Sequence, residues 1–287
     1  MLLSSFSFAL VNLIVKVLSD QHQQYPLIQD YPVFELVLFR CLVSLSICIA
    51  IIKARKIPFF GNNIPWLITR GLAGSIGLSL FFFTLTNLPM ALATIIQYLS
   101  PIFTIIFAIY INKQKVNPIQ WLFFSIALIG VLIIGLKEDS LPFNPIWVMV
   151  GLISAFFSGI AYNAIIKCSK TDHPITVVMY FPLVATPVAF TLTLFTEYVI
   201  PSGIEWLLLL LIGVLTQIAQ VAMTRAFNAD VASRVSPVKY VGAIYALAIG
   251  YFIFDETLSF FATIGVIFIL IGVLLNTFLK DLKLRRI

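Results

Sequence analysis

Charged side chains are scarce in this sequence. Asp, Glu, Lys and Arg make up 10% of the 287 residues, whereas hydrophobic residues make up 61%. A soluble domain is roughly half apolar and about a quarter charged, so this composition is typical of an integral membrane protein. The longest polar interval, roughly from Ser19 to Tyr31, is too short to bury a core of its own. The sequence therefore predicts one membrane domain and excludes a sizeable soluble domain.

Residues suited to metal binding or nucleophilic catalysis are also few. The two histidines, His22 and His173, fall in predicted loops on opposite sides of the membrane. The three cysteines, Cys41, Cys48 and Cys168, fit no disulfide or metal spacing, and we interpret them as small structural residues. No paired carboxylates face each other in the predicted membrane region. We therefore expect no metal, no cofactor and no enzymatic activity.

Long apolar runs make up most of the chain. Segmentation at Pro, Gly and charge clusters gives ten stretches, each near the length of a helix that crosses a bilayer. They cover roughly residues 2–18, 34–52, 65–87, 89–111, 118–136, 145–166, 175–196, 204–225, 231–253 and 258–279. The first stretch lacks a basic leader and an Ala-x-Ala cleavage site, so we expect it to be retained as a helix. The predicted fold is an all-α integral membrane protein with ten transmembrane helices.

The positions of Lys and Arg predict the orientation in the membrane. Eleven of them fall in or beside loops on one side of the predicted topology, and only Lys137 falls on the other. The eleven are Lys53, Arg55, Lys56, Lys113, Lys115, Lys167, Lys170, Lys280, Lys283, Arg285 and Arg286. Cytoplasmic loops are enriched in these residues, so we expect both termini to be cytoplasmic in an inner or plasma membrane. The net charge of +6 follows from this topology, and no nucleic-acid partner is expected.

An internal repeat divides the chain in two. The sequence Leu-Ile-Gly-Val-Leu at 128–132 recurs at 270–274, and the same offset of 142 pairs Phe39 with Phe181 and Gly71 with Gly213. The first helix joins at an offset of 151, which pairs Asn12 with Asn163. The repeats, 1–142 and 143–287, contain five predicted spans each. Because an odd number of spans turns the second repeat over, the prediction is an inverted-topology repeat with a site at the midplane.

Several short motifs follow this repeat in order. They are Lys16 at the end of the first helix, Phe39-Arg40, Arg70-Gly71-x-x-Gly74, Tyr98-x-x-Pro101, Asp255-Glu256, and Gly-Val-Leu in the fifth and tenth helices. Together they resemble the EamA branch of the drug/metabolite transporter superfamily over essentially the whole chain. The resemblance implies a substrate cavity between the halves and metabolite transport, often export, by alternating access. Gln114 departs from the pattern where the second half has Glu256, so a role for that acid carries over to Glu256 only.

Ionisable groups near helix ends can reach water. We expect Lys16, Arg70, Lys167 and Arg225 to extend their charged heads to the membrane interface. Glu35 lies near the outer boundary and, with Asp255 and Glu256, is interpreted as a solvated acid. Arg40 is five residues from Glu35, on a different face, so the two are not expected to pair. Asp230 suits the N-terminal cap of the ninth helix.

Deeper polar residues are the candidates for substrate binding. They lie at equivalent positions of the two halves or on the helices where the halves should meet. The set consists of Asn12, Gln97, Tyr98, Asn163, Gln217, Gln220, Lys239 and Tyr240. The alternative for each amide is hydrogen bonding between helices. Three glycines of the third helix, Gly71, Gly74 and Gly77, are interpreted as a close-packing surface.

Lys239 is the most informative candidate because it lies about 13 Å from the start of its predicted helix. We predict that it holds the anionic group of an amino acid-like, zwitterionic or anionic substrate. The alternatives are a deprotonated lysine or one that faces lipid. The predicted function is a secondary transporter for a small organic metabolite, working as an exporter; the alternatives are a channel and a structural membrane protein. Coupling to protons or another ion, and a homodimer, both remain open.

Overall fold

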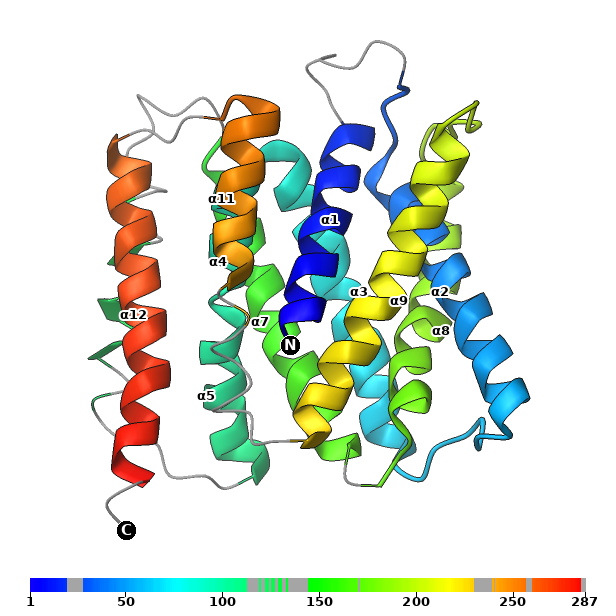
Figure 1. Ribbon diagram of the computed structural model, residues 1–287, viewed down its shortest axis with the longest axis horizontal. Helices are drawn as coiled ribbons and strands as arrows, with labels where there is room; N and C mark the ends of the chain where they lie inside the picture. Colours follow the sequence, from blue (N-terminus) through cyan, green and yellow to red (C-terminus); the bar gives the residue numbers. More distant parts are fainter. Residues whose placement is uncertain are drawn as a thin grey trace.

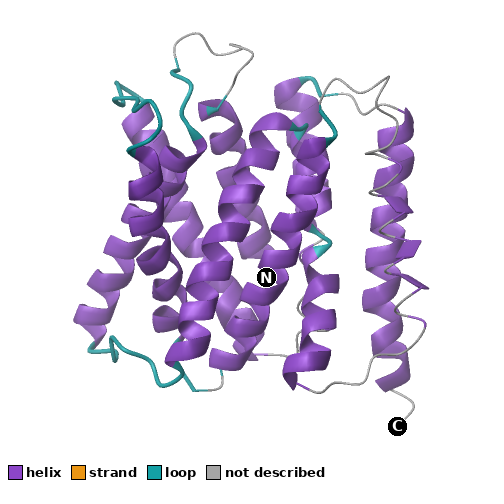
Figure 2. Ribbon diagram, turned by 180° about the vertical axis from the view of Figure 1, so that it is seen from behind, coloured by secondary structure: helices purple, strands orange, loops and turns teal. Residues whose placement is uncertain are grey.

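The computed structural model describes residues 1–19, 28–112, 144–169, 171–229, 239, 241–256 and 260–284, with single positions between 119 and 133. In these described residues the regular elements are helices, without strands (Figure 2). The helices are α1 (Leu2–Leu18), α2 (Val33–Arg55), α3 (Ile64–Asn87), α4 (Met90–Gln97), α5 (Ser100–Asn112), α7 (Ile146–Cys168), α8 (Pro174–Thr193), α9 (Glu205–Ala229), α11 (Val241–Phe254) and α12 (Phe260–Leu284).

Most of the predicted spans agree with these helices to within a few residues. Six spans, one of them α4 and α5 taken together over Met90–Ile111, are long and apolar enough to cross a membrane. Shorter apolar helices cover Leu2–Leu18, Ile244–Phe254 and Thr263–Gly272. The predicted span 118–136 and the first part of 231–253 lie largely outside the described residues. The chain is a helical, multi-pass membrane protein.

The predicted fourth span is interrupted, and Pro101 explains the interruption. We expected one helix over 89–111, but Tyr98 and Leu99 form a turn between α4 and α5. Pro101 has no backbone N–H to donate to the carbonyl of Gln97, and its ring disfavours a continuous helix there. The N–H groups of Tyr98 and Leu99 bond instead to the carbonyls of Ile95 and Ile96, three residues back. Gln97, Tyr98 and Ser100, at and beside this break, line a cavity.

The helices pack in an order that interleaves the two parts of the chain (Figure 1). α3 lies against α7 and α8, while α9 lies against α1 and α2. α2 also packs on α8, and α11 packs on α4 and α1. The C-terminal ends of α1 and α11 lie at the upper end of Figure 1, and the α2–α3 connection and the end of α12 lie at the lower end. We keep the terms upper end and lower end for these two sides.

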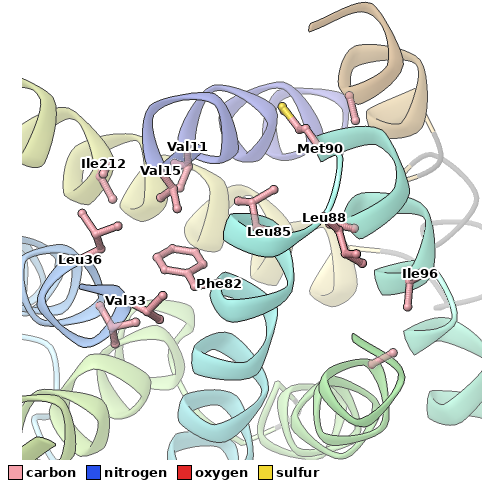
Figure 3. Packing of buried hydrophobic residues seen from close by; sticks show 14 of the residues in the cluster. Val11, Val15, Val33, Leu36, Phe82, Leu85, Leu88, Met90, Ile96 and Ile212 are labelled. Atoms are coloured by element: carbon pink, nitrogen blue, oxygen red, sulfur yellow. The ribbon is translucent and has the colours of Figure 1, made fainter. Parts of the chain in front are cut away.

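An apolar cluster of buried side chains surrounds Phe82 (Figure 3). Phe82 of α3 is fully buried among side chains of α1, α2 and α9. Its neighbours include Val11, Val15, Leu36, Leu85 and Ile212, each with no exposed surface. Fully burying one such side chain contributes about 1.5–3 kcal/mol relative to leaving it in water. The cluster therefore holds the upper halves of these helices together.

Other apolar side chains point away from the protein. Ile68, Leu72 and Ile76 follow one another by one helical turn on α3 and are 43%, 49% and 42% exposed. A contiguous apolar stripe of this kind is unfavourable in water. Because lipid tails solvate it instead, the stripe marks a face of α3 that contacts the bilayer.

Candidate functional site

A cavity of about 150 Å³ lies among the helices of both parts of the chain. Its walls come from α1 to α5 on one side and from α7, α8, α9 and α11 on the other, together with Lys239. The polar wall residues are Ser4, Ser5, Asn12, Arg40, Arg70, Thr94, Gln97, Tyr98, Ser100, Ser158, Tyr162, Gln220 and Lys239. A polar cavity inside a helical membrane protein is the place where irregular or charged groups are tolerated, because it holds water or ligand.

Two arginines form one part of the wall. Arg40 and Arg70 are 3% and 4% exposed, and their guanidinium carbons lie 5.9 Å and 5.0 Å from the centre of the Phe181 ring. The guanidinium of Arg40 also lies 5.3 Å from the ring of Phe82. Aromatic faces attract cations, and they do so more strongly where water is excluded. The rings therefore hold both charged heads at the cavity without neutralising them.

Glycines of α3 make room for this arrangement. A Cβ at Gly74 would collide with the guanidinium of Arg70 and would lie 2.8 Å from the Phe181 ring. A Cβ at Gly71 would lie 2.8 Å from the carbonyl oxygen of Tyr180. Gly77 meets Ser158 of α7 in the same way, at 3.1 Å from its Oγ. The predicted close-packing surface is confirmed, and Gly74 in addition leaves the space that the Arg70 head occupies.

Lys239 lies at another part of the wall. Its Nζ is 3.6 Å from the centre of the Tyr162 ring and 5.5 Å from that of Phe227. Tyr162 interacts electrostatically with both Lys239 and Arg70. Lys239 therefore lines the cavity, as expected of a substrate-binding residue, and its role in binding stays a prediction. Tyr240, predicted beside it, lies outside the described residues.

Three predicted amides also line the cavity. Gln97, at the end of α4, donates from Nε2 to Ser158 Oγ at 2.8 Å and accepts from Ser154 Oγ at 2.9 Å. Gln220 accepts a hydrogen bond at 3.0 Å from Arg70. Asn12 is 7% exposed, and its side chain has no hydrogen-bond partner among the described residues. An amide loses free energy when it is buried without partners, so Asn12 is suited to bind a molecule in the cavity. Tyr98, predicted with them, lines the cavity too.

Asn163 and Gln217 lie elsewhere. Asn163 is fully buried and donates to the carbonyls of Thr104 and Gly159 at 2.8 Å and 3.0 Å. Gln217 accepts from Ser44 Oγ at 2.6 Å and donates to Cys48 Sγ at 3.1 Å, so it connects α9 to α2. Both make the contacts that we gave as the alternative to substrate binding, and we do not carry them into the proposed site.

Two basic residues do not extend to the interface as predicted. Arg70 is buried at the cavity, and Lys16 donates to the carbonyls of Leu85 and Leu88 at 3.3 Å and 2.6 Å. The carbonyl groups at the end of α3 have no partner within their own helix, so they attract this ammonium. Arg225 is exposed, in agreement with the prediction, and Lys167 lies 5.9 Å from the Trp66 ring.

The interpretation of Glu256 and Glu35 as solvated acids is wrong. Glu256 forms an ion pair with Lys16 at 3.4 Å, and its carboxylate accepts the N–H of Met90 at 2.7 Å and 2.9 Å. The side chain therefore caps the start of α4, whose first N–H groups lack helical partners. Glu35 is fully buried and accepts the N–H of Val199 at 3.1 Å. Asp255, next to Glu256, is exposed as expected.

The loops outside the spans carry two shifted pKa values. Burial and a hydrogen bond to Glu205 at 2.8 Å raise the pKa of Tyr31 above its usual range. Burial, together with the positive charges of Arg225 and Arg55, lowers the pKa of His173. His173 Nδ1 accepts the N–H of Ile175 at 3.2 Å and so caps α8. Both groups stabilise loops and lie outside the cavity wall.

Sequence reasoning missed Arg40, Tyr162 and four serines, Ser4, Ser5, Ser100 and Ser158, as wall residues. Arg40 could have been found, because it is seven residues, roughly 10 Å, into α2 and has no acid one turn away. The serines carried no such signal, since Ser occurs throughout membrane helices as a small packing residue.

A helical bundle with an exposed apolar stripe and a cavity lined by basic and amide groups is typical of membrane proteins that carry a site for a small polar molecule. A model of the EamA-like transporter family matches residues 1–136 and 145–278. The chain belongs to this family, within the drug/metabolite transporter superfamily.

Relatives of the chain are named transporters rather than enzymes. The pseudopaline exporter CntI of Pseudomonas aeruginosa (strain UCBPP-PA14) is 30% identical over 88% of this chain and 86% of that protein. The S-adenosylmethionine uptake transporter of Rickettsia prowazekii (strain Madrid E) is 24% identical over 88% and 85%. Human solute carrier family 35 member G1 is 28% identical over 85% and 68%. A protein of solved crystal structure matches 98% of each chain with a TM-score of 0.65 at 19% identity, which shows a shared fold.

Proposed function

We propose that this protein is a secondary transporter that exports a small amino acid-like metabolite, zwitterionic or anionic, by alternating access. The observation that carries the proposal is the cavity itself, which Asn12 and three basic side chains line from both parts of the chain. Asn12 has no hydrogen-bond partner among the described residues, so a bound molecule supplies what its amide lacks. Export is favoured by the 30% identical relative that is named an exporter.

An inverted repeat of five plus five helices is part of the proposal. Under the sequence offsets of 142 and 151, α1, α2, α3 and α5 are equivalent to α7, α8, α9 and α11. Packing pairs among these eight helices then have counterparts among the same helices: α3 with α7 and α9 with α1, α3 with α8 and α9 with α2, α5 with α7 and α11 with α1. The two stretches that the family model matches have similar lengths. These correspondences support repeats at 1–142 and 143–287.

The proposed orientation follows from charge. The α2–α3 connection, with Lys53, Arg55 and Lys56, and the end of α12 lie at the lower end in Figure 1. We assign this end and both termini to the cytoplasm of an inner or plasma membrane, because basic loops are retained there. Reporter fusions that place the 112–117 and 138–144 loops on the same side of the membrane would contradict this assignment.

The mechanism assigns a role to each part of the site. Lys239 and the arginines bind anionic groups of the substrate, while Asn12 and Gln97 orient it by hydrogen bonds. The Lys16–Glu256 pair and the apolar cluster around Phe82 join the helices at the upper end. Release toward that end requires these contacts to separate, and the inverted repeat supplies an equivalent movement at the lower end. An ion gradient, of protons or another ion, supplies the energy.

The test is flux in proteoliposomes that contain the purified protein and radiolabelled amino acids and four-carbon dicarboxylates. We expect saturable, stereoselective flux that Asn12→Leu reduces about tenfold or more, since a hydrogen bond to a charged group contributes about 1.5–3 kcal/mol. Gln217→Leu, which removes an amide outside the cavity, is the matched control and should retain transport. Flux that is linear with concentration and equal in protein-free liposomes would refute the carrier.

A further inference from the structure

The cavity wall has an uneven charge. Three basic side chains line it, Arg40, Arg70 and Lys239, and no acidic side chain does so among the residues that the structure describes. A buried charge that lacks a counter-ion is costly, and a site of three raises this cost through mutual repulsion. The wall therefore carries a positive charge that its described neighbours do not balance.

Four acids of the described spans and loops have other partners. Glu35 accepts from Val199, Glu205 from Tyr31 and Ser202, Glu256 from Met90, and Asp172 from Asn62 and Thr171. Glu256 is in addition paired with Lys16. None of these four carboxylates is a wall residue of the cavity. Among the described residues no carboxylate lines the wall beside the arginines, so an anion bound in the cavity would supply their counter-charge.

The two arginines present unused donors. The Nε of Arg40 and the Nε of Arg70 are buried without a hydrogen-bond partner in the described part of the chain. One terminal nitrogen of Arg70 donates to Gln220. Both guanidinium groups lie within 6 Å of the centre of the same ring, Phe181, so they can bind one anionic group together. Guanidinium groups match carboxylate and phosphate oxygens in geometry as well as charge.

Lys239 forms a second basic position. It lies over the Tyr162 ring, not over the Phe181 ring, and Tyr162 interacts electrostatically with both Lys239 and Arg70. The cavity therefore has one basic position at Phe181 and another at Tyr162. Its volume of about 150 Å³ equals that of an engineered cavity that takes up benzene, a molecule of six carbon atoms. Eight non-hydrogen atoms, as in a four-carbon dicarboxylate, are of comparable size.

We propose that the transported metabolite is a compact organic dianion, with one acidic group bound by Arg40 and Arg70 and the other by Lys239. This inference rests on the proposed transport function and narrows its substrate class. A monoanion would leave two of the three basic groups unbalanced, and a zwitterion would place its own ammonium in a basic site. A second carboxylate or a phosphate monoester fits the same two positions.

The test compares four-carbon probes that differ in charge and hardly in length. Succinate, butanoate, 4-aminobutanoate and 1,4-diaminobutane are added to the purified protein, and thermal stabilisation and competition for flux are measured. We expect succinate to bind about 10- to 100-fold more tightly than butanoate, since each ionic hydrogen-bond group contributes that much to affinity. 1,4-Diaminobutane should have no effect. A phosphate monoester of three carbons, glycerol 3-phosphate, distinguishes carboxylate from phosphate recognition.

Variants of the basic residues test which of them produce the preference for succinate over butanoate. Arg70→Gln should reduce the ratio of succinate affinity to butanoate affinity about tenfold. Arg225→Gln removes the same charge from an exposed position of α9 outside the wall and should leave the ratio unchanged. Arg40→Lys retains the charge at the Phe181 position and should retain more of the preference than Arg40→Gln. An equal ratio in wild type and Arg70→Gln would contradict the assignment.

The outcomes separate this inference from the proposed function. Tighter binding of 4-aminobutanoate or 1,4-diaminobutane than of succinate and glycerol 3-phosphate would overturn the dianion and leave a carrier of another substrate. The dianion would also be overturned if amino acids are transported while no dianion stabilises the protein against heat or competes for flux. Absence of any protein-dependent, saturable flux would overturn the carrier itself.

Discussion

Replacing Glu256 tests the contact that joins α1 and α4 to the end of α11. Its carboxylate lies 3.4 Å from Lys16 Nζ and accepts the Met90 N–H, and the two side chains are 12% and 18% exposed. Glu256→Gln retains an acceptor oxygen and removes the charge. We expect a loss of about 0.5–1 kcal/mol from the partly exposed ion pair and about as much from the helix terminus. The sum, about 1–2 kcal/mol, lowers the apparent melting temperature by roughly 2–8 °C.

The assay is thermal unfolding in detergent of the wild type, Glu256→Gln, Lys16→Met and the double variant. Because the two groups touch, the double variant should lose about 0.5–1 kcal/mol less than the sum of the single losses. Asp255→Asn is the matched control, since it removes one negative charge from the exposed neighbouring position and should change little. Additive losses, or equal losses for Asp255→Asn and Glu256→Gln, would refute the contact.

Further predictions concern the cavity, a helix cap and a packing glycine. Gln97→Leu should reduce transport more than tenfold, because it removes an amide at the cavity and its hydrogen bonds to Ser154 and Ser158 of α7. Gln217→Leu should lower only the melting temperature. Flux and thermal melting assays measure the two effects. His173 has a lowered pKa in the folded protein, so the unfolded chain takes up its proton first, and stability should fall as the pH drops below about 6.5. His173→Asn, which keeps a capping acceptor, should show a smaller difference in melting temperature between neutral and mildly acidic buffer; an equal difference would exclude His173 as its cause. Gly77→Val should prevent stable purification or lower the free energy of unfolding by about 1–3 kcal/mol. The reason is that even a Cβ at this position would lie 3.2 Å from the backbone nitrogen of Ser158 on α7. An unaltered melting temperature would contradict that close approach.

Most helices could be predicted from the sequence, because a membrane-spanning helix is recognised by the length and apolar composition of its segment alone. The limits of α1 agree residue for residue with the predicted 2–18 stretch. The break after Gln97 was missed, although Pro101 is a visible cause, because an apolar run continues through it. A hydropathy pattern depends on side-chain composition, so it does not reveal the one backbone N–H that Pro101 lacks.

The wall residues were only partly predictable. Depth along a helix identified Asn12, Gln97 and Lys239, since polar groups far from both ends need a cavity or a partner. Depth failed for Arg70 and Lys16, which are near enough to helix ends to reach water yet turn inward. Their direction depends on Phe181 and on carbonyl groups of α3, which are distant in sequence.

Access to the cavity from both sides is the most direct test of alternating access. Cys41, Cys48 and Cys168 are buried, so Ser158→Cys adds one thiol at the cavity wall. In sealed vesicles of each orientation, a membrane-impermeant thiol reagent should label this position more than the wild type from either side. Succinate, or whichever probe proves to be transported, should slow labelling from both sides. Labelling from one side only, in every condition, would contradict a transport site in this cavity. Labelling at a rate that a transported substrate leaves unchanged would contradict it as well.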